Sequence, residues 1–229
     1  MPGDVCAPPE VTGLILAAGE GRRFGGRPKA FADCENQTLL AHAIALVSPW
    51  AERIVVGVRS SDLDRARATV ATLPEAERVI CMPGGSTRQE SLNRILTCAM
   101  SRFVLVHEVA RPWAEAIDFQ NLLRTVRNHP AVALYRRLPA RDSLAVLDGE
   151  YLGTLLPRES VVTLQTPQAY ERSVLLSAYA TALREGWVET STAALVQRAG
   201  CPVRLIEGTG NNLKVTYPED LPATTRIAG

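Results

Sequence analysis

The sequence predicts an α/β fold of the Rossmann-like type, in which helices flank a mostly parallel sheet and a β-hairpin arm protrudes. Apolar segments of strand length alternate with amphipathic helical segments as far as Tyr135, which is typical of βαβ units. A loop rich in glycine and arginine directly follows the first apolar segment, Leu14 to Ala18. The alternation then stops between residues 138 and 163, where no helical period is present.

Each predicted element has a local signal. Strands of β-branched and aliphatic residues are expected at 14–18, 53–58, 78–82, 102–106, 131–135, 161–164 and 203–206. Thr38 is a suitable N-cap for a helix whose apolar residues, from Leu39 to Val47, fall on one face. Further helices are expected at about 62–72, after Ser86, around 119–126, at 171–184 and at 191–199.

The segment 138–163, which we call the arm, is predicted to contain a hairpin. Residues 143–146 and 151–155 have strand composition, and Asp148-Gly149 is a turn signal between them. An isolated hairpin is marginally stable in water, so the arm should pack against something else. A partner subunit is a good candidate, and we expect a homodimer.

Length and composition exclude several classes of protein. The 229 residues fit one domain (1–229) with the arm inside it, and a hydrophobic content of 46% suffices for a core. A net charge of +1 argues against a nucleic-acid-binding protein. No apolar run reaches membrane-spanning length and no secretory signal is apparent, while five scattered cysteines suggest neither disulfides nor zinc. We therefore expect a cytoplasmic protein without a membrane partner.

The glycine-rich loop predicts a polyphosphate site. We expect Gly19, Gly21, Gly25 and Gly26 to adopt positive φ angles and to let the backbone approach an anion. Arg22, Arg23, Arg27 and Lys29 add positive charge to the same loop. The dinucleotide-binding and Walker A patterns both fail here, since Phe24 replaces a glycine and Arg27-Pro28 follow Gly26. A surface turn with solvated arginines is the alternative.

A second glycine turn, at residues 83–91, leads into a helix. Ser86 followed by Gln89 matches a capping box, with Ser86 as the N-cap. Free backbone N–H groups at such a helix start could hold a base or a ribose, together with the side chains of Arg88 and Ser91. A well-capped structural helix explains the same pattern equally well.

Polar residues follow the strand expected at 102–106. Open α/β sheets bind ligands at the carboxyl ends of their strands, where Glu108 could hold Mg²⁺ beside a phosphate. His107 could act as a base, although a hydrogen-bonding structural role is the more usual one for a histidine at a strand end.

Four landmarks in this order carry a family resemblance: Leu16-Ala17-Ala18-Gly19 with Pro28-Lys29, Gly84-Gly85 with Arg88 and Ser91, His107 with Ala110-Arg111-Pro112, and Thr166-Pro167-Gln168 with Asn212-Leu213-Lys214. From about Val11 onward the chain resembles the 2-C-methyl-D-erythritol 4-phosphate cytidylyltransferases of the non-mevalonate isoprenoid pathway. The first landmark is shared with many sugar nucleotidyltransferases, and the other three are more specific.

The resemblance implies a reaction of CTP with a phosphorylated polyol, assisted by Mg²⁺, that gives a CDP-alcohol and pyrophosphate. It also implies an arm that dimerises and reaches toward the other subunit's site. The implied catalytic residues are Arg23, Lys29 and Lys214, and the implied metal ligand is Glu108. The implied nucleotide-binding residues are Ala17, Ala18, Gly19, Gly21, Gly85, Ser86, Arg88 and Ser91, with Arg88 supporting the turn. The implied acceptor-binding residues are Arg111, Ser143, Arg158 and Thr166.

The chain departs from the family pattern at several positions. Glu108 and Asn211 stand where the family usually has aspartate, Ser143 stands where it has threonine, and the segment after Trp187 differs. Four alternatives therefore stay open: a cytidylyltransferase for ribitol 5-phosphate, one for a phosphonate, a guanylyltransferase, and a catalytically weak nucleotide-binding relic.

Overall fold

The computed structural model describes residues 11–139 and 143–221. The strands are β1 (Val11–Leu16), β2 (Asp33–Cys34), β3 (Gln37–Thr38), β4 (Arg53–Val58), β5 (Val79–Pro83), β6 (Phe103–Glu108), β7 (Ala131–Arg137), β8 (Leu144–Asp148), β9 (Tyr151–Leu156), β10 (Val162–Glu171) and β11 (Arg204–Glu207). The helices are α1 (Leu39–Val47), α2 (Leu63–Ala71), α3 (Arg88–Leu96), α4 (Ala116–Thr125), α5 (Arg172–Glu185) and α6 (Thr192–Arg198).

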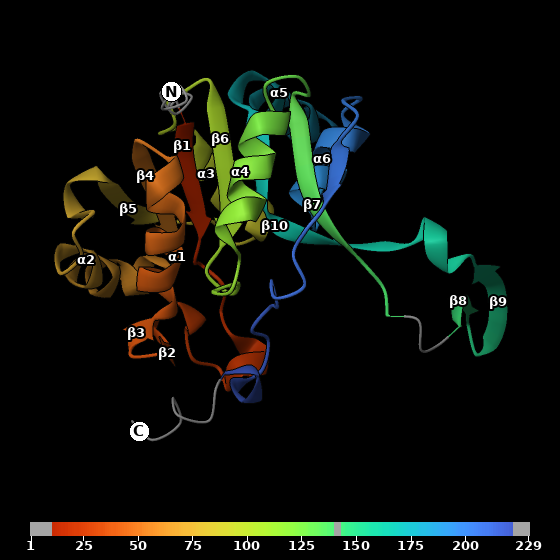
Figure 1. Cartoon of the computed structure of the whole chain (residues 1–229), viewed down its shortest axis with the longest axis horizontal. Coiled ribbons are helices and arrows are strands. Elements are labelled where there is room, and N and C mark those ends of the chain that lie inside the picture. The colour runs from red at the N-terminus through yellow and green to blue at the C-terminus, as the bar shows by residue number, and fades with distance from the viewer. Residues whose placement is uncertain (1–10, 140–142, 222–229) are drawn as a thin grey trace, which may run out of the picture.

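Seven strands form one mixed sheet in the order β11-β7-β10-β6-β1-β4-β5 (Figure 1). Strands β6, β1, β4 and β5 run parallel to one another, as does β11 to β7, whereas β10 is antiparallel to both β6 and β7. The predicted fold class is therefore confirmed. Parallel neighbours end at the same edge of the sheet, so the loops after β1, β4, β5 and β6 gather there.

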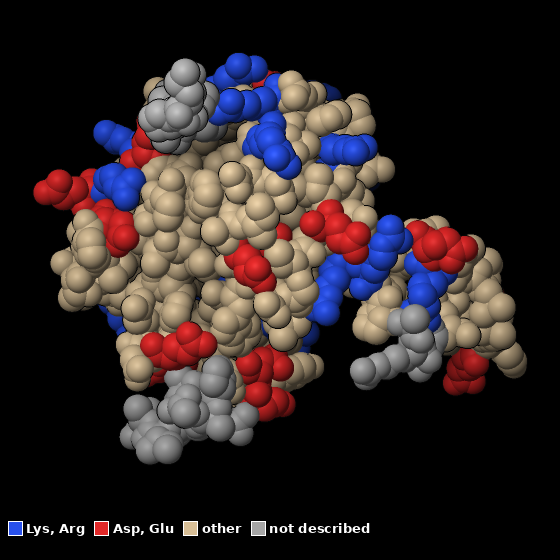
Figure 2. Space-filling view, viewed as in Figure 1, with Lys and Arg blue, Asp and Glu red and all other residues tan. Residues whose placement is uncertain are grey.

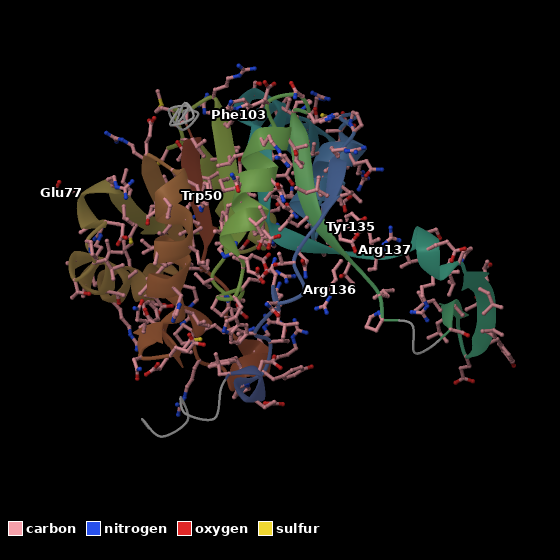
Figure 3. All side chains as sticks on the ribbon, viewed as in Figure 1. Trp50, Glu77, Phe103, Tyr135, Arg136 and Arg137 are labelled. Atoms are coloured by element: carbon pink, nitrogen blue, oxygen red, sulfur yellow. The ribbon has the colours of Figure 1, made fainter. Side chains whose placement is uncertain are left out.

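Helices cover both faces of the sheet, because the central strands are apolar on both sides. Ile15 of β1 belongs to a core formed with α1, α2 and α4, while its neighbour Leu14 belongs to a second core formed with α3, α5 and α6. The rings of Trp50 (labelled in Figure 3) and Phe119 stack within the first layer with centroids 6.2 Å apart. Thr38 caps α1 as predicted, its Oγ1 accepting a hydrogen bond from the Ala41 amide.

The predicted hairpin is present in the arm. Strands β8 and β9 pair with each other as a separate two-stranded sheet, which stands away from the main body (Figures 1 and 2). The labels of Arg136 and Arg137 in Figure 3 mark where β7 leaves the body toward the arm. Large apolar side chains of the hairpin are exposed: Leu147 is 78% exposed, Tyr151 79% and Leu152 76%. A single chain thus leaves the apolar surface of its arm in water.

Candidate active site

A cavity of about 540 Å³ opens where the loops after β1, β4, β5 and β6 meet. It is lined by residues 16–23 after β1, Lys29 and Ala30, Arg59 after β4, residues 85–88 and Ser91, residues 108–110 at the end of β6, and Lys214. The sequence predictions from the first two landmarks therefore converge on one space. Within the described chain, six cationic side chains but only two carboxylates, Glu20 and Glu108, contribute to the lining.

The glycine-rich loop curls tightly at one side of this cavity. Gly21 has a φ of 65° and its carbonyl accepts hydrogen bonds from the amides of Phe24 and Gly26. A Cβ atom at Gly21 would lie 1.9 Å from the Arg27 carbonyl oxygen, so only glycine fits. Gly25 and Gly26 also have positive φ, but Gly19 does not, and that expectation was wrong. Arg27 belongs to the loop without lining the cavity.

The three predicted catalytic cations lie around the same cavity although they come from distant parts of the chain. The Lys29 ammonium donates a 3.0 Å hydrogen bond to the carbonyl of Val215, the residue after Lys214. Burial lowers the pKa of Lys29, and the charges of Lys214 and Arg23 lower it further. Mutual repulsion of this kind is relieved when an anion enters, so the cluster suits a polyphosphate.

Glu108 occupies the floor of the cavity between two cations. Its Oε1 atom accepts a 2.8 Å hydrogen bond from Arg88 Nε and its Oε2 atom one of 2.6 Å from Lys214 Nζ. Burial alone would raise the pKa of Glu108, but the charges of Arg88 and Lys214 outweigh it and lower the pKa to about 2. The carboxylate is therefore ionised at every physiological pH, and both its oxygens are already paired.

The second glycine turn differs in detail from the prediction. The N-cap of α3 is Thr87, not Ser86: the Thr87 hydroxyl accepts from the Glu90 amide, and the Glu90 carboxylate accepts from the Ser86 amide and hydroxyl. The Gly85 amide donates to the Ser91 hydroxyl at 3.0 Å. The amides of Gly85 and Ser86 thus already have side-chain partners, contrary to the expectation of free N–H groups.

Arg88 leaves this turn and crosses the cavity floor. Besides Glu108 it binds the buried Thr192 hydroxyl at 2.8 Å, which links the start of α3 to the start of α6. The expected support of the turn is instead supplied by Arg94, whose Nη1 donates to the Gly84 carbonyl at 2.7 Å. Arg88 consequently orients Glu108 rather than the turn.

The four residues expected to bind the acceptor fall into two groups. Thr166 is buried beside Glu108, whose amide donates to the Thr166 hydroxyl at 3.2 Å. Arg111 is buried as well and donates to the Asn212 carbonyl at 2.8 Å. Ser143 and Arg158 lie in the arm, where Arg158 donates to the Pro139 carbonyl. None of the four lines the cavity described above.

His107 has the structural role that the sequence favoured. It is fully buried, its Nε2 lies 3.1 Å from the Arg111 carbonyl oxygen, and burial lowers its pKa to about 4. A neutral, enclosed imidazole of this kind cannot reach a substrate.

The sequence analysis missed Arg59 altogether, and it named Asn212 only within a landmark and gave it no role. Arg59 lines the cavity, and the rule that ligands bind at strand ends would have found it directly after the strand 53–58. Asn212 is buried, and its Nδ2 donates to the Thr166 carbonyl at 2.8 Å, which joins the segment before Lys214 to β10. No local sequence pattern indicates that contact.

A Rossmann-like mixed sheet with a glycine-rich, cation-lined cavity at the carboxyl ends of its strands is the arrangement expected of a nucleotidyltransferase. A family model described as "IspD: 2-C-methyl-D-erythritol 4-phosphate cytidylyltransferase" matches residues 11–228. The chain therefore belongs to the 2-C-methyl-D-erythritol 4-phosphate cytidylyltransferase family.

Individual relatives agree with this assignment. The cytidylyltransferase of that name from Deinococcus radiodurans is 34% identical over 221 residues, covering 96% of this chain and 90% of the relative. One from Thermus thermophilus is 36% identical over 219 residues, covering 96% and 97%. The crystal structure of a protein of that name from Thermus thermophilus superimposes with a TM-score of 0.74 at 31% identity, covering 90% of this chain and 93% of the other. Among residues 11–139 and 143–221, no helix could cross a membrane.

Proposed function

We propose that this protein transfers the cytidylyl group of CTP to 2-C-methyl-D-erythritol 4-phosphate. An oxygen of the acceptor phosphate attacks the α-phosphorus of CTP while the bond from that phosphorus to the β-phosphate oxygen breaks. Pyrophosphate leaves and a CDP-alcohol is formed. Family membership carries the choice of CTP and of this acceptor over ribitol 5-phosphate, a phosphonate or GTP.

One observation carries the assignment of roles: Arg23, Lys29 and Lys214 converge on one cavity from distant parts of the chain. A phosphate nucleophile needs no strong base, so catalysis consists of positioning and charge neutralisation. The three cations would neutralise the transferring phosphoryl group and the departing pyrophosphate. Ala17, Ala18, Gly19 and Gly21 on one side, and Gly85, Ser86 and Ser91 on the other, would hold the nucleotide, while Arg88 would act through Glu108, which it orients.

Mg²⁺ fits this site as an ion that enters with the triphosphate. Mg²⁺ prefers oxygen ligands and is commonly held through one or two carboxylates plus substrate phosphates. The carboxylates that line the cavity are Glu20, which is exposed and paired with Arg22, and Glu108, which is only 13% exposed and is ionised. Glu108 would therefore be the protein residue that holds the ion. The ion would neutralise charge on the phosphate oxygens.

The Lys29→Ala variant tests the catalytic assignment. Loss of one such cation typically lowers the rate on the order of a hundredfold, so pyrophosphate release with CTP and 2-C-methyl-D-erythritol 4-phosphate should fall at least about tenfold. Arg27→Ala is the matched control, because Arg27 lies in the same loop and does not line the cavity. A folded Lys29→Ala enzyme with full activity would contradict the assignment.

We further propose that the protein is a homodimer whose arms complete the acceptor site. The exposed apolar side chains of the arm need a partner surface, and Ser143 and Arg158 lie in the arm while Thr166 and Arg111 lie in the body. Arg158→Ala should then raise the acceptor KM and leave CTP affinity unchanged.

Subunit mixing separates a shared site from a self-contained one. If each arm serves the partner's site, a mixture of Lys29→Ala and Arg158→Ala chains, assayed at an acceptor concentration well below the raised KM, should be more active than either variant alone, because some dimers contain one intact composite site. A mixture that is no more active than the separate variants after subunit exchange, which a tagged pull-down would verify, would contradict the composite site.

A further inference from the structure

Strand β4 ends between the two segments that line the nucleotide cavity. It lies between β1 and β5 in the sheet. The Gly57 carbonyl accepts a 2.8 Å hydrogen bond from the Ala17 amide, and the Val58 carbonyl accepts one of 2.6 Å from the Gly84 amide. Arg59 is the next residue and lines the cavity. The backbone therefore delivers a guanidinium between the glycine-rich loop and the second glycine turn.

The Arg59 side chain is held in place at its Nε atom. Its Nε donates a 2.6 Å hydrogen bond to Asp62 Oδ2, and the two side chains are 31% and 13% exposed. Within the described chain, the terminal nitrogens of Arg59 donate no hydrogen bond to another residue. The hydrogen bond to Asp62 is the main cause that raises the pKa of Arg59, and the charge of Glu20 in the glycine-rich loop raises it further. Arg59 is thus a fixed, permanently charged donor with free donor groups near that loop.

The surroundings favour an anionic ligand for these free donors. A guanidinium binds phosphate oxygens through two parallel hydrogen bonds, and fixing its Nε preorganises the other two nitrogens. Both carboxylates of the cavity lining are already paired, Glu20 with Arg22 and Glu108 with Arg88 and Lys214. Among the described residues that line the cavity, no carboxylate without a hydrogen-bonded partner is left for Arg59.

We propose that Arg59 is a further triphosphate-binding residue, positioned by Asp62, which raises CTP affinity by contacting phosphate oxygens of the bound nucleotide. This inference rests on the proposed function, because it takes the ligand of the cavity to be CTP. Arg59 reaches the cavity from the side of β4, whereas Lys29 and Lys214 come from the loops beside Glu108. We expect the contact between Arg59 and CTP to form when CTP binds and to persist unchanged in the transition state. A contact that stabilises bound substrate and transition state equally lowers KM without raising kcat.

Calorimetric titration of the Arg59→Ala variant with CTP and with cytidine tests this role. Charge-assisted hydrogen bonds predict at least about tenfold weaker CTP binding, with cytidine binding unchanged because cytidine lacks phosphates. The kcat should stay within about threefold of the wild type while the KM for CTP rises. Asp62→Ala should cause a smaller loss of CTP affinity, because the charge remains but its orientation is released. Arg53→Ala, at the exposed start of the same strand, removes an equal charge and should leave CTP affinity unchanged.

Several results would overturn the inference. CTP affinity of a folded Arg59→Ala variant within about twofold of the wild type would do so, as would equal losses for CTP and cytidine. A fall in kcat at unchanged CTP affinity would assign Arg59 to the transition state instead. Thermal unfolding and circular dichroism establish that each variant is folded, and Arg59→Lys gives a second variant that keeps the charge. Failure of the wild type to bind CTP would refute the proposed function, whereas an unaffected Arg59→Ala variant beside a CTP-binding wild type refutes only the inference.

Discussion

Replacing Glu108 by glutamine should destabilise the folded protein by about 3 kcal/mol at pH 7. The pKa of Glu108 is lowered from 4.5 to about 2 despite its burial, because Arg88 and Lys214 each donate to one of its oxygens. A difference of that size corresponds to about 3 kcal/mol of preferential stabilisation of the charged form in the fold. Removing one partner of a fully buried ion pair costs about 3–5 kcal/mol, and the lower end applies here because Arg88 and Lys214 are 27% and 43% exposed. For a chain of this length we expect a fall in Tm of about 6–12 °C.

The same variant should lose the corresponding pH dependence. Since the folded-state pKa lies below the unfolded one, the stabilisation is present above about pH 4.5 and is lost as the pH falls through about 2. The difference in unfolding free energy between wild type and Glu108→Gln should therefore shrink across that window, and taking this difference removes the contribution of other carboxylates. Urea unfolding without CTP at several pH values measures this difference in unfolding free energy. A separate titration of enzyme activity with Mg²⁺ shows whether the Glu108→Gln variant needs a higher Mg²⁺ concentration.

Glu77→Gln is the matched control, since Glu77 is exposed on the opposite side of the molecule from the arm (Figure 3) and should unfold like the wild type. A Glu108→Gln protein with wild-type stability at pH 7 would refute the reasoning, since it would mean that the two cations do not stabilise the carboxylate. The double variant with Arg88→Gln distinguishes the pair from its parts. The double variant should lose less unfolding free energy than the two single variants lose in sum, because no unpaired arginine is left beside the uncharged side chain at position 108.

Two further predictions concern the same site. Gly21→Ala should abolish CTP binding, because its Cβ would lie 1.9 Å from the Arg27 carbonyl oxygen. Gly25→Ala is the control: Gly25 has a similar φ but no atom within 4 Å of the added Cβ, so the substitution should cost only about 1 kcal/mol of strain. Equal effects of the two substitutions in CTP titrations and unfolding experiments would contradict the steric argument. His107 should make the free energy of unfolding rise with pH between about pH 4 and 6.5, because burial lowers its pKa to about 4 and only the unfolded chain binds the proton in that range. The slope should reach about 1.4 kcal/mol per pH unit and should be lost in His107→Asn. A slope that persists unchanged in His107→Asn would contradict this prediction.

The regular elements could be predicted because their signals are local. Strand 53–58 was predicted with the bounds that β4 has, and the Thr38 cap was correct. The start of α3 was misplaced by one residue for an identifiable reason. Ser86 and Thr87 are both hydroxyl residues, with Gln89 three positions after the first and Glu90 three positions after the second. In the structure the Glu90 carboxylate accepts from the Ser86 amide and hydroxyl, while the Thr87 hydroxyl accepts from the Glu90 amide and caps the helix.

Contacts across the cavity floor could not be predicted in this way. Arg88 binds Glu108, 20 residues away, and Thr192, 104 residues away, and neither spacing follows from a helical or strand period. Arg59 is the opposite case: the sequence analysis missed it, although its position at the end of a predicted strand would have been sufficient to propose it. The sequence predicted which residue types stand at the strand ends of this site. It did not predict which of their side chains hydrogen-bond to each other.

The residues proposed to bind the acceptor show why one chain is an incomplete source of information. Strand β10 connects the arm to the sheet, and Thr166 lies at its register shift, bonded to the Glu108 amide and to Asn212. Arg158 precedes the same strand in the arm, which stands away from the body (Figure 1). The periodic signals of this sequence report on packing within the chain, whereas the proposed partner surface for the exposed apolar side chains of the arm lies on another chain. The order of the landmarks pointed to the acceptor residues, but in the proposed dimer only a second copy of the chain brings Arg158 to a cavity, so the geometry of acceptor binding would be a property of the assembly.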